Sequence, residues 1–590
     1  MWISSYNNLR SVSKPVSLAL AVMMMFIPFP SGAGEDPMPC DSPSGELVVQ
    51  PDKTPGAYTR KRFKVKLKVE GGSLDSKIYY TLDGSKPTTG SCRYRDRRGI
   101  VVRRRPHRKT LASRFKDMAV MANSRIRRVR IPDATVIRTM AVDPVTGEES
   151  LPQTFSYMPG TDFKSLYGHD VAVLSVTVAP EDLLDYENGI LVKGKVYDEW
   201  ASSNDVDRIM KDQMYWKIIG NYMMSGRKWE RTADLELFDN TDDNLITLTR
   251  EVGIRVKGHL SRIYLQRGFN LYFRGDDGPG PLRYAFFSKN EVQELGALPE
   301  VGEWESVALF NGGNETEVSK FRDPLVQTLG EGLELSRQVF RPAVLYLNGE
   351  YWGMYYLQEK YSKEYFNHHY GVSPDNVVIM FDGEVDVGHK EDMALYERFL
   401  RFSDMDFSDP EVWSIFKSEV DVLSLADWLA VQIYIGNHDV FFPDGRNECL
   451  WRTRTSGGEG YSDGKWRWAL RDVQFSMGLY GLPRTVPGFD SFSYALLNYP
   501  LFSELMECRE FRSLMRERFS LVIDAFSPER SIPVMEAILS GTDGMLSDTR
   551  KRFNYNKDIT SLEQSHARNY LLERPAVAAG WLEKYCSVNE

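Results

Sequence analysis

The stretch "RPAVLYLNGEYWGMYYLQEKY", residues 341–361, consists of two apolar segments joined by Asn-Gly. Asn and Gly adopt the left-handed backbone that a two-residue hairpin turn requires. We therefore predict that residues 343–349 and 352–358 form neighbouring strands of a buried hairpin. We interpret its Tyr and Trp residues as core packing, with a sugar-binding surface as the alternative.

Strands and helices are predicted on both sides of this hairpin. Further short apolar segments predict strands, and apolar residues at three- and four-residue steps predict helices, as does most of 500–590. The predicted strands are 171–178, 253–258, 268–274 and 305–310, and the predicted helices are 319–330, 361–370, 393–403 and 422–436. We interpret residues 165–590 as one α+β domain with a helical C-terminal part.

Residues 41–158 have the pattern of an all-β unit. The segment "RFKVKLKV", residues 62–69, alternates between polar and apolar side chains, and "KIYYTLDG", residues 77–84, resembles a strand that ends in a turn. Short strands separated by polar turns are typical of a small sandwich. The Gly, Pro and Asp content of residues 157–170 indicates a linker to the second domain.

The overall composition is that of a globular protein. Of 590 residues, 42% are hydrophobic and 26% are charged, and 12 Trp, 30 Tyr and 30 Phe argue against a disordered chain. The net charge of −9 gives no general case for binding nucleic acid. One segment differs: "RYRDRRGIVVRRRPHRK", residues 93–109, is densely basic. It is either a solvated hairpin face or an anchor for an acidic polymer or cell surface.

The N-terminus has the features of an export signal. Arg10 and Lys14 precede an apolar run that Pro28 and Pro30 interrupt, and small residues follow near Ala33. We predict a signal peptide over residues 1–33 and a mature protein outside the cytoplasm, periplasmic, surface-located or secreted, with no transmembrane span. An uncleaved anchor is the alternative.

The cysteines are few and do not suggest a metal site. The chain has five cysteines and no CxxC, so we expect no zinc site, and the sequence leaves a Cys40–Cys92 bridge open.

Three polar residues follow buried elements in an order that phosphoryl-transfer enzymes use. Asp439 follows an apolar helix, Asn447 stands eight residues later, and Asp472 ends the strand-like "KWRWAL". In kinases, a loop Asp handles the acceptor hydroxyl, and an Asn and a second Asp hold magnesium. The alternative is that these residues only cap helices and turns. The chain lacks "HRD" and "DFG", and the spacing from Asp439 to Asn447 is longer than in protein kinases.

At "IYYTLDGSKPT", residues 78–88, the chain resembles the chitobiase/β-hexosaminidase C-terminal-like domain, an Ig-like accessory module. The later "I-x-x-x-A" of that module matches Ile137 to Ala141, whereas the Arg-rich segment replaces its usual short connection. The resemblance implies a spacer or binding unit over residues 41–158, with a carbohydrate or surface polymer as its candidate partner, and no catalytic activity.

Residues 190–480 resemble the CotH kinase family, named for the spore coat protein H. The resemblance is carried by linked motifs in the family order: "GILVKG" (189–194), "GNYMMSGRKWERTADLELF" (220–238), "GIRVKGHLSRIYLQRGFNLYFR" (253–274), "LFNGGN" (309–314), "RDPLVQTL" (322–329), residues 341–361, "NHDVFFPDGRN" (437–447) and "GKWRWALRD" (464–472). It implies an atypical protein-kinase-like fold and ATP-dependent phosphorylation of secreted or surface proteins, with Mg²⁺ or Mn²⁺.

The family motifs assign roles to individual residues. Asp439 matches the catalytic Asp, Asn447 the amide that follows it, and Asp472 the metal-binding Asp. Two further matched residues are expected to contact the phosphates: Arg262 in the family's "G-x-S-R" turn, and Arg267, which stands where a phosphate-binding Lys is usual. Lys257 lies nearby in sequence and is the expected substitute for that Lys. Glu359, after "G-x-Y-x-L", is expected either to line the nucleotide cleft or to pair with a phosphate-binding base.

Two departures from the family pattern keep other functions open. Arg267 replaces Lys, and Gln474 replaces the second acid or amide of the metal-binding strand. We therefore expect an exported protein kinase acting on Ser or Thr of secreted or surface proteins. The alternatives are a catalytically degenerate kinase fold that acts as a binding or scaffold protein, and adenylyl transfer on the same fold. We expect no nucleic-acid partner.

Overall fold

The computed structural model describes residues 47–104, 111–121, 124–168, 171–239, 245–274, 280–287, 302–441 and 447–587. The predicted signal peptide, Cys40 and part of the Arg-rich segment lie outside these residues. Within them, no helix has the length and apolar character needed to cross a bilayer.

The hairpin predicted from Asn-Gly is present. β17 (Phe340–Leu347) pairs antiparallel with β18 (Glu350–Gln358). Asn348 and Gly349 connect them with φ angles of 48° and 80°, the left-handed backbone of a type I′ turn. Every residue of β18 is buried, because β17 and β16 (Ser306–Phe310) flank it and helix α14 (Pro528–Phe553) lies against it. This explains a strand with no polar alternation.

The hairpin belongs to a closed β-barrel. The strand order is β10–β11–β12–β13–β16–β18–β17, and the parallel pair of β17 with β10 closes the ring. The other barrel strands are β10 (Ala172–Val178), β11 (Arg231–Phe238), β12 (Leu248–Lys257) and β13 (Gly268–Tyr272). Buried Val, Leu and Phe side chains from these strands form one hydrophobic cluster, so the barrel is filled rather than hollow.

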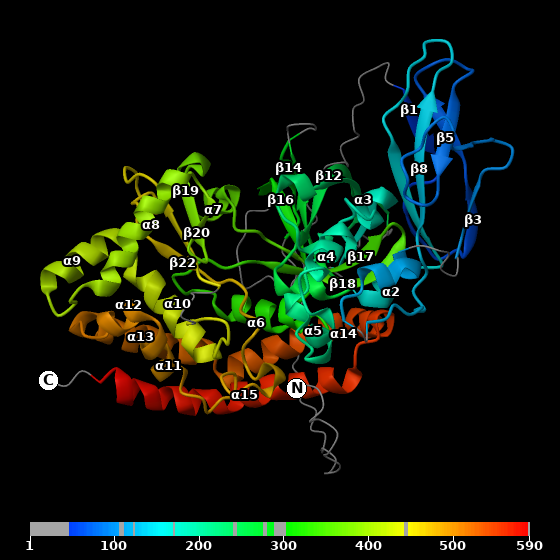
Figure 1. Cartoon of the computed structure of the whole chain (residues 1–590). Helices are drawn as coiled ribbons and strands as arrows, with labels where there is room; N and C mark the ends of the chain where they lie inside the picture. The colour runs from blue at the N-terminus through cyan, green and yellow to red at the C-terminus, as the bar shows by residue number, and fades with distance from the viewer. Residues whose placement is uncertain are drawn as a thin grey trace, which may run out of the picture.

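A second sheet and a helical region follow the barrel (Figure 1). The sheet has the order β20 (Glu384–Val387), β19 (Val377–Phe381), β21 (Cys449–Thr453) and β22 (Arg467–Ala469). The helices of the helical region share one large apolar cluster. The main ones are α6 (Arg322–Leu329), α8 (Met393–Leu400), α9 (Pro410–Glu419), α10 (Val422–Ile435), α13 (Arg509–Ala525) and α15 (Lys557–Tyr585).

Shorter elements complete the described chain. The short helices are α1 (Phe115–Met118), α2 (Phe163–Tyr167), α3 (Pro180–Leu184), α4 (Gly194–Ala201), α5 (Val206–Lys211), α7 (Lys363–Tyr370), α11 (Ser491–Asn498) and α12 (Pro500–Leu505). A two-stranded sheet joins β14 (Leu282–Tyr284) to β15 (Gly302–Trp304).

The N-terminal part is a two-layered sandwich. One layer has the order β2–β9–β8–β5–β6, and the other contains the pairs β3–β7 and β1–β4. The strands are β1 (Val48–Pro51), β2 (Gly56–Tyr58), β3 (Arg62–Val65), β4 (Leu67–Glu70), β5 (Lys77–Thr81), β6 (Cys92–Arg93), β7 (Ile100–Arg103), β8 (Thr135–Val142) and β9 (Gln153–Pro159). Phe63, Val65 and Val102 of one layer and Ile78 and Ile137 of the other belong to one core.

The five-stranded layer of the sandwich is docked on the barrel through buried polar contacts. Arg138 forms a 2.8 Å ion pair with Asp234 of β11, and the backbone N–H of Ser156 donates to the carboxyl of Glu236 at 2.8 Å. Burial raises the pKa of Glu236 to about 8. The sandwich is therefore attached by specific contacts as well as by the linker.

The sequence located the regular elements well. Predicted strands 171–178, 268–274 and 305–310 correspond to β10, β13 and β16, and the predicted helix 422–436 corresponds to α10. The β-rich N-terminal unit and the helical C-terminal part agree with the predicted multidomain architecture. The kinase-like arrangement stays a prediction, as do the domain boundaries 1–33, 41–158 and 165–590.

Candidate active site

The first candidate loop begins where α10 ends. α10 is buried along nearly its whole length and ends at Gly436, whose φ of 59° provides a left-handed C-terminal cap. The side chain of Asn437 then accepts a 3.1 Å hydrogen bond from the backbone N–H of Asp439. This local turn fixes the backbone of Asp439, whose carboxylate stays partly exposed beside His438 at 3.5 Å.

The second candidate loop, residues 471–482, follows β22 and has an unusual backbone. Asp472, Met477 and Tyr480 have positive φ angles of 56°, 44° and 59°. Such angles are uncommon outside glycine and concentrate at functional sites. The carboxylate of Asp472 accepts a hydrogen bond from the side-chain amide of Gln474. The loop therefore holds Asp472 in the left-handed region, which Asp adopts more readily than most residues, and Met477 and Tyr480 in a region that is costlier for them.

The two loops are in direct contact. The backbone N–H of His438 donates to the carbonyl of Phe475 at 2.8 Å, and the two rings stack with centroids 4.5 Å apart. Since Asp439 and Asp472 are separated from these residues by only one and three positions, both carboxylates belong to the same region of the molecule. The structure thus brings together two acids that are 33 positions apart in the sequence.

Three cations gather on the barrel side of Asp472. Lys257, at the end of β12, interacts electrostatically with Asp472 and Asp323, and with the neighbouring cations Arg471 and Lys360. Burial, and secondly the charge of Arg471, lower the pKa of Lys257 to about 8. Burial also lowers the pKa of Lys360. All three cations remain partly exposed to solvent, so a ligand can reach them.

Asp323 is the buried acid of this cluster. It lies in the first turn of α6 and accepts a 3.2 Å hydrogen bond from Gln327. Burial, and secondly the charge of Asp472, raise the pKa of Asp323 to about 7. Its position opposite Lys257 resembles the Lys–acid pair with which kinases orient a phosphate-binding lysine.

Asn447 lies at the edge of the same region. It has a φ of 59°, and its backbone N–H donates to the carboxylate of Asp382. Asp382 in turn interacts with Arg471 and Asp472. Residues 442–446, between Asp439 and Asn447, lie outside the described residues. Asn447 is therefore connected to the Asp472 cluster through Asp382.

A glycine loop closes one side of the site. Gly312 and Gly313, in the quoted motif "LFNGGN" (309–314), have φ angles of 107° and 55°. A Cβ at Gly313 would collide with the side-chain amide of Gln474. The glycine loop therefore approaches the side chain of Gln474, which hydrogen-bonds to Asp472, more closely than a residue with a Cβ could.

Two of the predicted phosphate contacts are occupied by the protein itself. Arg267 is fully buried, where its guanidinium donates to the carbonyls of Arg262 at 2.7 Å and Met118 at 2.8 Å. Arg262 donates to the carbonyls of Met223 and Met224. Both guanidinium groups are committed to backbone carbonyls, so this geometry favours a structural role for them. Lys257, the expected substitute for the family's Lys, is the residue whose charge interacts with Asp323 and Asp472.

Glu359 is also held by the protein. Its carboxylate accepts from the backbone N–H of Val339 and lies 2.9 Å from His369. It is buried, and its charge is used between β18 and α7 rather than beside Lys257. The next residue, Lys360, faces the cation cluster instead.

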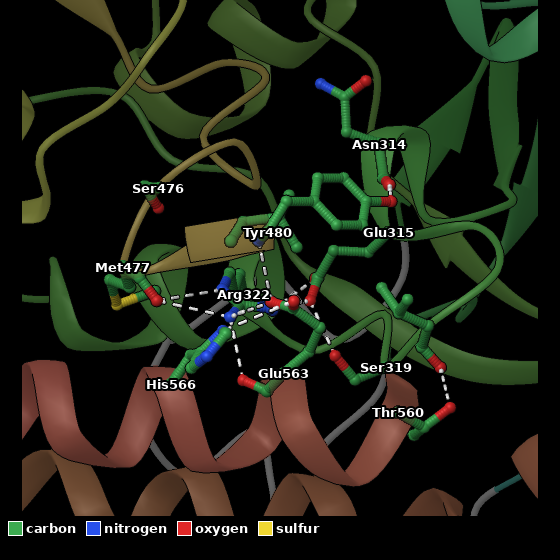
Figure 2. Close-up of polar contacts among 12 residues, drawn as sticks. Asn314, Glu315, Ser319, Arg322, Ser476, Met477, Tyr480, Thr560, Glu563 and His566 are labelled. Atoms are coloured by element: carbon green, nitrogen blue, oxygen red, sulfur yellow. Dashed lines mark hydrogen bonds and ion pairs between the residues drawn. The ribbon is translucent and has the colours of Figure 1, made fainter. Parts of the chain in front are cut away.

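A buried charge network contacts the Asp472 loop on the side of α6 and α15. Figure 2 shows Arg322 between Glu315, at 2.6 Å, and Glu563 of α15, at 3.2 Å. Arg322 also donates to the carbonyl of Met477, and Glu563 accepts from the backbone N–H of Tyr480 at 3.0 Å. The network therefore ties the strained loop to α6 and to the C-terminal helix.

Sequence reasoning missed four charged residues of the site: Asp323, Lys360, Arg471 and Asp382. Asp323 and Lys360 lay inside the quoted family motifs, and Arg471 directly precedes Asp472. An acid in the first turn of a predicted helix was the one local signal for Asp323, and a helix-capping acid gives the same signal. Only the tertiary structure separates the two interpretations.

The residues around Asp472 fit a divalent cation that is bound together with phosphate oxygens. Magnesium prefers carboxylate and amide oxygens and takes further ligands from water and phosphate. The buried side-chain oxygen of Gln474 has no hydrogen-bond partner among the described residues. Anywhere among the described residues, no group of three or more His, Cys, Asp or Glu is arranged to hold a metal ion. The site therefore offers one carboxylate and an amide oxygen.

Comparison with known proteins supports this interpretation at the level of the family. Residues 254–577, more than half of the chain, match the family described as CotH kinase protein. Residues 53–154 match the chitobiase/beta-hexosaminidase C-terminal domain. No match to an individual curated protein was found.

Proposed function

The chain belongs to the CotH kinase protein family, and from this premise we propose that it transfers the γ-phosphate of ATP to serine or threonine hydroxyls of proteins. The observation that carries the proposal is the cluster of Lys257, Asp323 and Asp472 beside the Asp439 loop. Desolvated cations and acids gathered at the meeting point of two loops are what phosphoryl transfer requires.

The cations would bind the phosphates. Lys257, Lys360 and Arg471 repel one another electrostatically, and burial already lowers the pKa of both lysines. A triphosphate would remove this repulsion and keep all three side chains charged. Asp323 would orient the ammonium group of Lys257. We therefore assign phosphate binding to these three residues.

Asp472 would hold a divalent metal, with Asn447 or the amide oxygen of Gln474 beside it. When bound, magnesium or manganese would neutralise charge on the β- and γ-phosphates. The support for this assignment is the partly exposed carboxylate of Asp472 and the side-chain oxygen of Gln474, which has no hydrogen-bond partner among the described residues. The charge network of Figure 2 would keep the loop in place.

Asp439 would receive the proton of the acceptor hydroxyl. Its carboxylate is partly exposed, and its backbone is fixed by Asn437. A base must reach the hydroxyl without being sequestered by the metal. Asp439 meets this requirement because it lies on a different loop from Asp472.

Incubation with γ-labelled and α-labelled ATP, with magnesium or manganese, tests the proposal. The protein is compared with Asp439→Ala, Asp472→Ala and, as a control, Asp404→Ala, which removes an exposed acid of the helical region. We expect γ-label on protein, a loss of about a thousandfold or more in the first two variants, and no change in the control. Label from the α position would instead identify an adenylyl transferase.

Gln474 favours a second candidate function, a binding or scaffold protein that retains the kinase fold. It replaces an acid or amide of the family pattern and hydrogen-bonds to Asp472. Magnesium-dependent ATP binding without transfer of either label, in the presence of candidate surface proteins, would favour this function.

We further propose that the protein acts outside the cytoplasm on secreted or surface proteins. The export-like N-terminus supports this proposal. Fractionation of cells that produce the tagged protein, with N-terminal sequencing of the mature form, tests it. Intact protein in the cytoplasmic fraction alone would contradict it.

A further inference from the structure

The charges of the two parts of the chain have opposite signs. Residues 47–160 contain 25 Lys and Arg against 10 Asp and Glu, a net charge of +15, whereas the whole chain has −9. The remainder therefore carries −24. A charge asymmetry of this size within one chain indicates an electrostatic partner for the basic part.

The basic side chains are concentrated on the outer layer of the sandwich. Along β3 and β4, the residues Phe63, Val65 and Leu67 point into the core, and the alternating positions are exposed. Those exposed positions are Arg62, Lys64, Lys66 and Lys68. In Figure 1, β3 lies on the side of the sandwich away from the barrel. The row is therefore open to a partner while the other layer is docked.

The neighbouring strand extends this row into a face. Arg62 pairs directly with Arg103 of β7. The backbone N–H of Arg104 donates to the carbonyl of Lys61 at 3.0 Å, and its guanidinium donates to the carbonyl of Arg130. Cations from three segments of the chain thus lie side by side. We call Lys61, Arg62, Lys64, Lys66, Arg103, Arg104 and Arg130 the basic face.

The centre of the basic face has few counter-charges: the carboxylate of Asp52 accepts a 2.6 Å hydrogen bond from the backbone N–H of Lys66, and its ion pair is with Lys53. Among the described residues, Arg62, Lys64, Lys66 and Arg103 form no ion pair with a carboxylate. Like charges directly opposite each other on paired strands are destabilising, so the Arg62–Arg103 pair has a cost that folding alone does not explain. An anionic ligand would remove that cost.

The chemistry of the face favours a linear acidic polymer. Successive outward residues of a strand are about 7 Å apart, so the row offers repeated cations to repeated anions. Arginine forks match carboxylate, sulfate and phosphate groups. No aromatic side chain of the described sandwich is strongly exposed, which argues against single-stranded nucleic acid, because that binds by base stacking.

A membrane surface is less well matched. Peripheral membrane binding usually combines basic residues with apolar side chains that insert. The large exposed apolar residues of the sandwich, Leu74, Leu82, Val145 and Leu151, lie outside the strands of the basic face.

We infer that the basic face binds an acidic polysaccharide and thereby holds the acidic kinase-family domain at a polyanionic surface. The inference does not rest on the proposed phosphoryl transfer. Binding is electrostatic, so its affinity falls as salt rises. The bound polymer lies along β3 and β7, on the opposite side of the sandwich from the barrel contacts.

Equilibrium binding of the full chain to labelled polymers tests the inference. The probes are heparin, which is sulfated, polygalacturonate, which is carboxylated, dextran as the neutral control, and a short DNA duplex. The test variant is Arg62→Gln/Lys64→Gln/Arg103→Gln. Its matched control, Arg509→Gln/Arg530→Gln/Lys557→Gln, removes the same number of exposed cations from the helical region.

We expect both acidic polysaccharides to bind, dextran not to bind, and binding to weaken steeply from about 50 mM to about 300 mM salt. The test variant should bind about tenfold more weakly, with unchanged circular dichroism and an unchanged or higher unfolding temperature. The control variant should bind like the parent. This combination supports the inference.

Three results would overturn it. The first is no binding of either acidic polysaccharide at low salt, or equal binding by the test variant and the parent. The second is a preference of tenfold or more for the DNA duplex, which would make the face a nucleic-acid interface. The third is salt-sensitive self-association that the test variant loses, which would dock the basic face on the acidic part of a second copy.

Discussion

Two neighbouring buried residues of α6, Arg322 and Asp323, belong to two charge clusters of different character. Arg322 has a direct ion pair with Glu315 at 2.6 Å and with Glu563 at 3.2 Å. Asp323 faces Lys257 and Asp472, yet in the part of the chain that the structure describes none of these three forms a direct ion pair with another.

This difference distinguishes a cluster with a structural role from a cluster that can bind a ligand. A cluster whose charges are all paired has nothing left to offer a ligand, and it holds segments together. A cluster whose charges are desolvated but unpaired is costly for the free protein and becomes favourable when a ligand completes it. Four substitutions test this difference between the two clusters.

Arg322→Met should have the largest effect. It leaves Glu315 and Glu563 buried without their partner, so we expect the free energy of unfolding to fall by about 3–5 kcal/mol. Urea denaturation measures it, with the exposed Arg509→Met as the control, expected within about 0.5 kcal/mol. A loss below about 1 kcal/mol for Arg322→Met would show that the network is not what holds the loop.

Asp323→Asn should stabilise the free protein, and the gain should depend on pH. The folded-state pKa of Asp323, about 7, lies above its unfolded value of 3.8. The parent therefore loses stability as pH rises from about 4 to about 7, and the variant does not. We expect little difference near pH 4 and a gain of about 2–4 kcal/mol at pH 8.

Unfolding curves of the parent and Asp323→Asn across this pH range measure the difference, with Asp404→Asn as the exposed control. Parallel pH dependences for the parent and the Asp323 variant would mean that Asp323 is already ionised at low pH, and the two clusters would then be alike.

Lys257→Met should separate binding from stability. We expect ATP–magnesium affinity to fall by about 10- to 100-fold, because the phosphates lose a charged donor. Stability should stay unchanged or rise, since a desolvated cation is removed. Titration calorimetry and thermal unfolding measure the two effects, with Lys557→Met as the control. If Lys257→Met unfolds the protein while affinity per folded molecule is retained, Lys257 belongs with Arg322 as a supporting residue.

Gln474→Asp should have the smallest effect. It restores an acid beside Asp472, and affinity for hard cations rises with the charge of the ligand set. We expect about fivefold tighter Mn²⁺ binding, and lower stability without metal because two carboxylates repel each other. Metal titration followed by thermal unfolding measures both. Unchanged Mn²⁺ affinity would place residue 474 outside the metal site.

The sequence predicted local features of the fold and of the site because short-range chemistry determines them. The Asn348-Gly349 turn, the end of α10 at Gly436 and the position of Asp439 all depend on backbone preferences within a few residues. The roles of individual cations could not be read in this way. Arg267 and Lys257 both carry a charge next to a turn. Arg267 donates to two backbone carbonyls, whereas the charge of Lys257 interacts with Asp472.

Sequence patterns were enough to predict the β-rich first unit, the strands and helices of the second, the family, and Asp439, Asn447 and Asp472 as candidate site residues. Which charges lie close together depends on the tertiary fold. The fold places Lys257 of β12 near Asp323 of α6, and α15 packs against the Asp472 loop and supplies Glu563. The physical reason is that periodicity and turn chemistry act over a few residues, whereas charge pairing depends on contacts between segments as much as 241 positions apart.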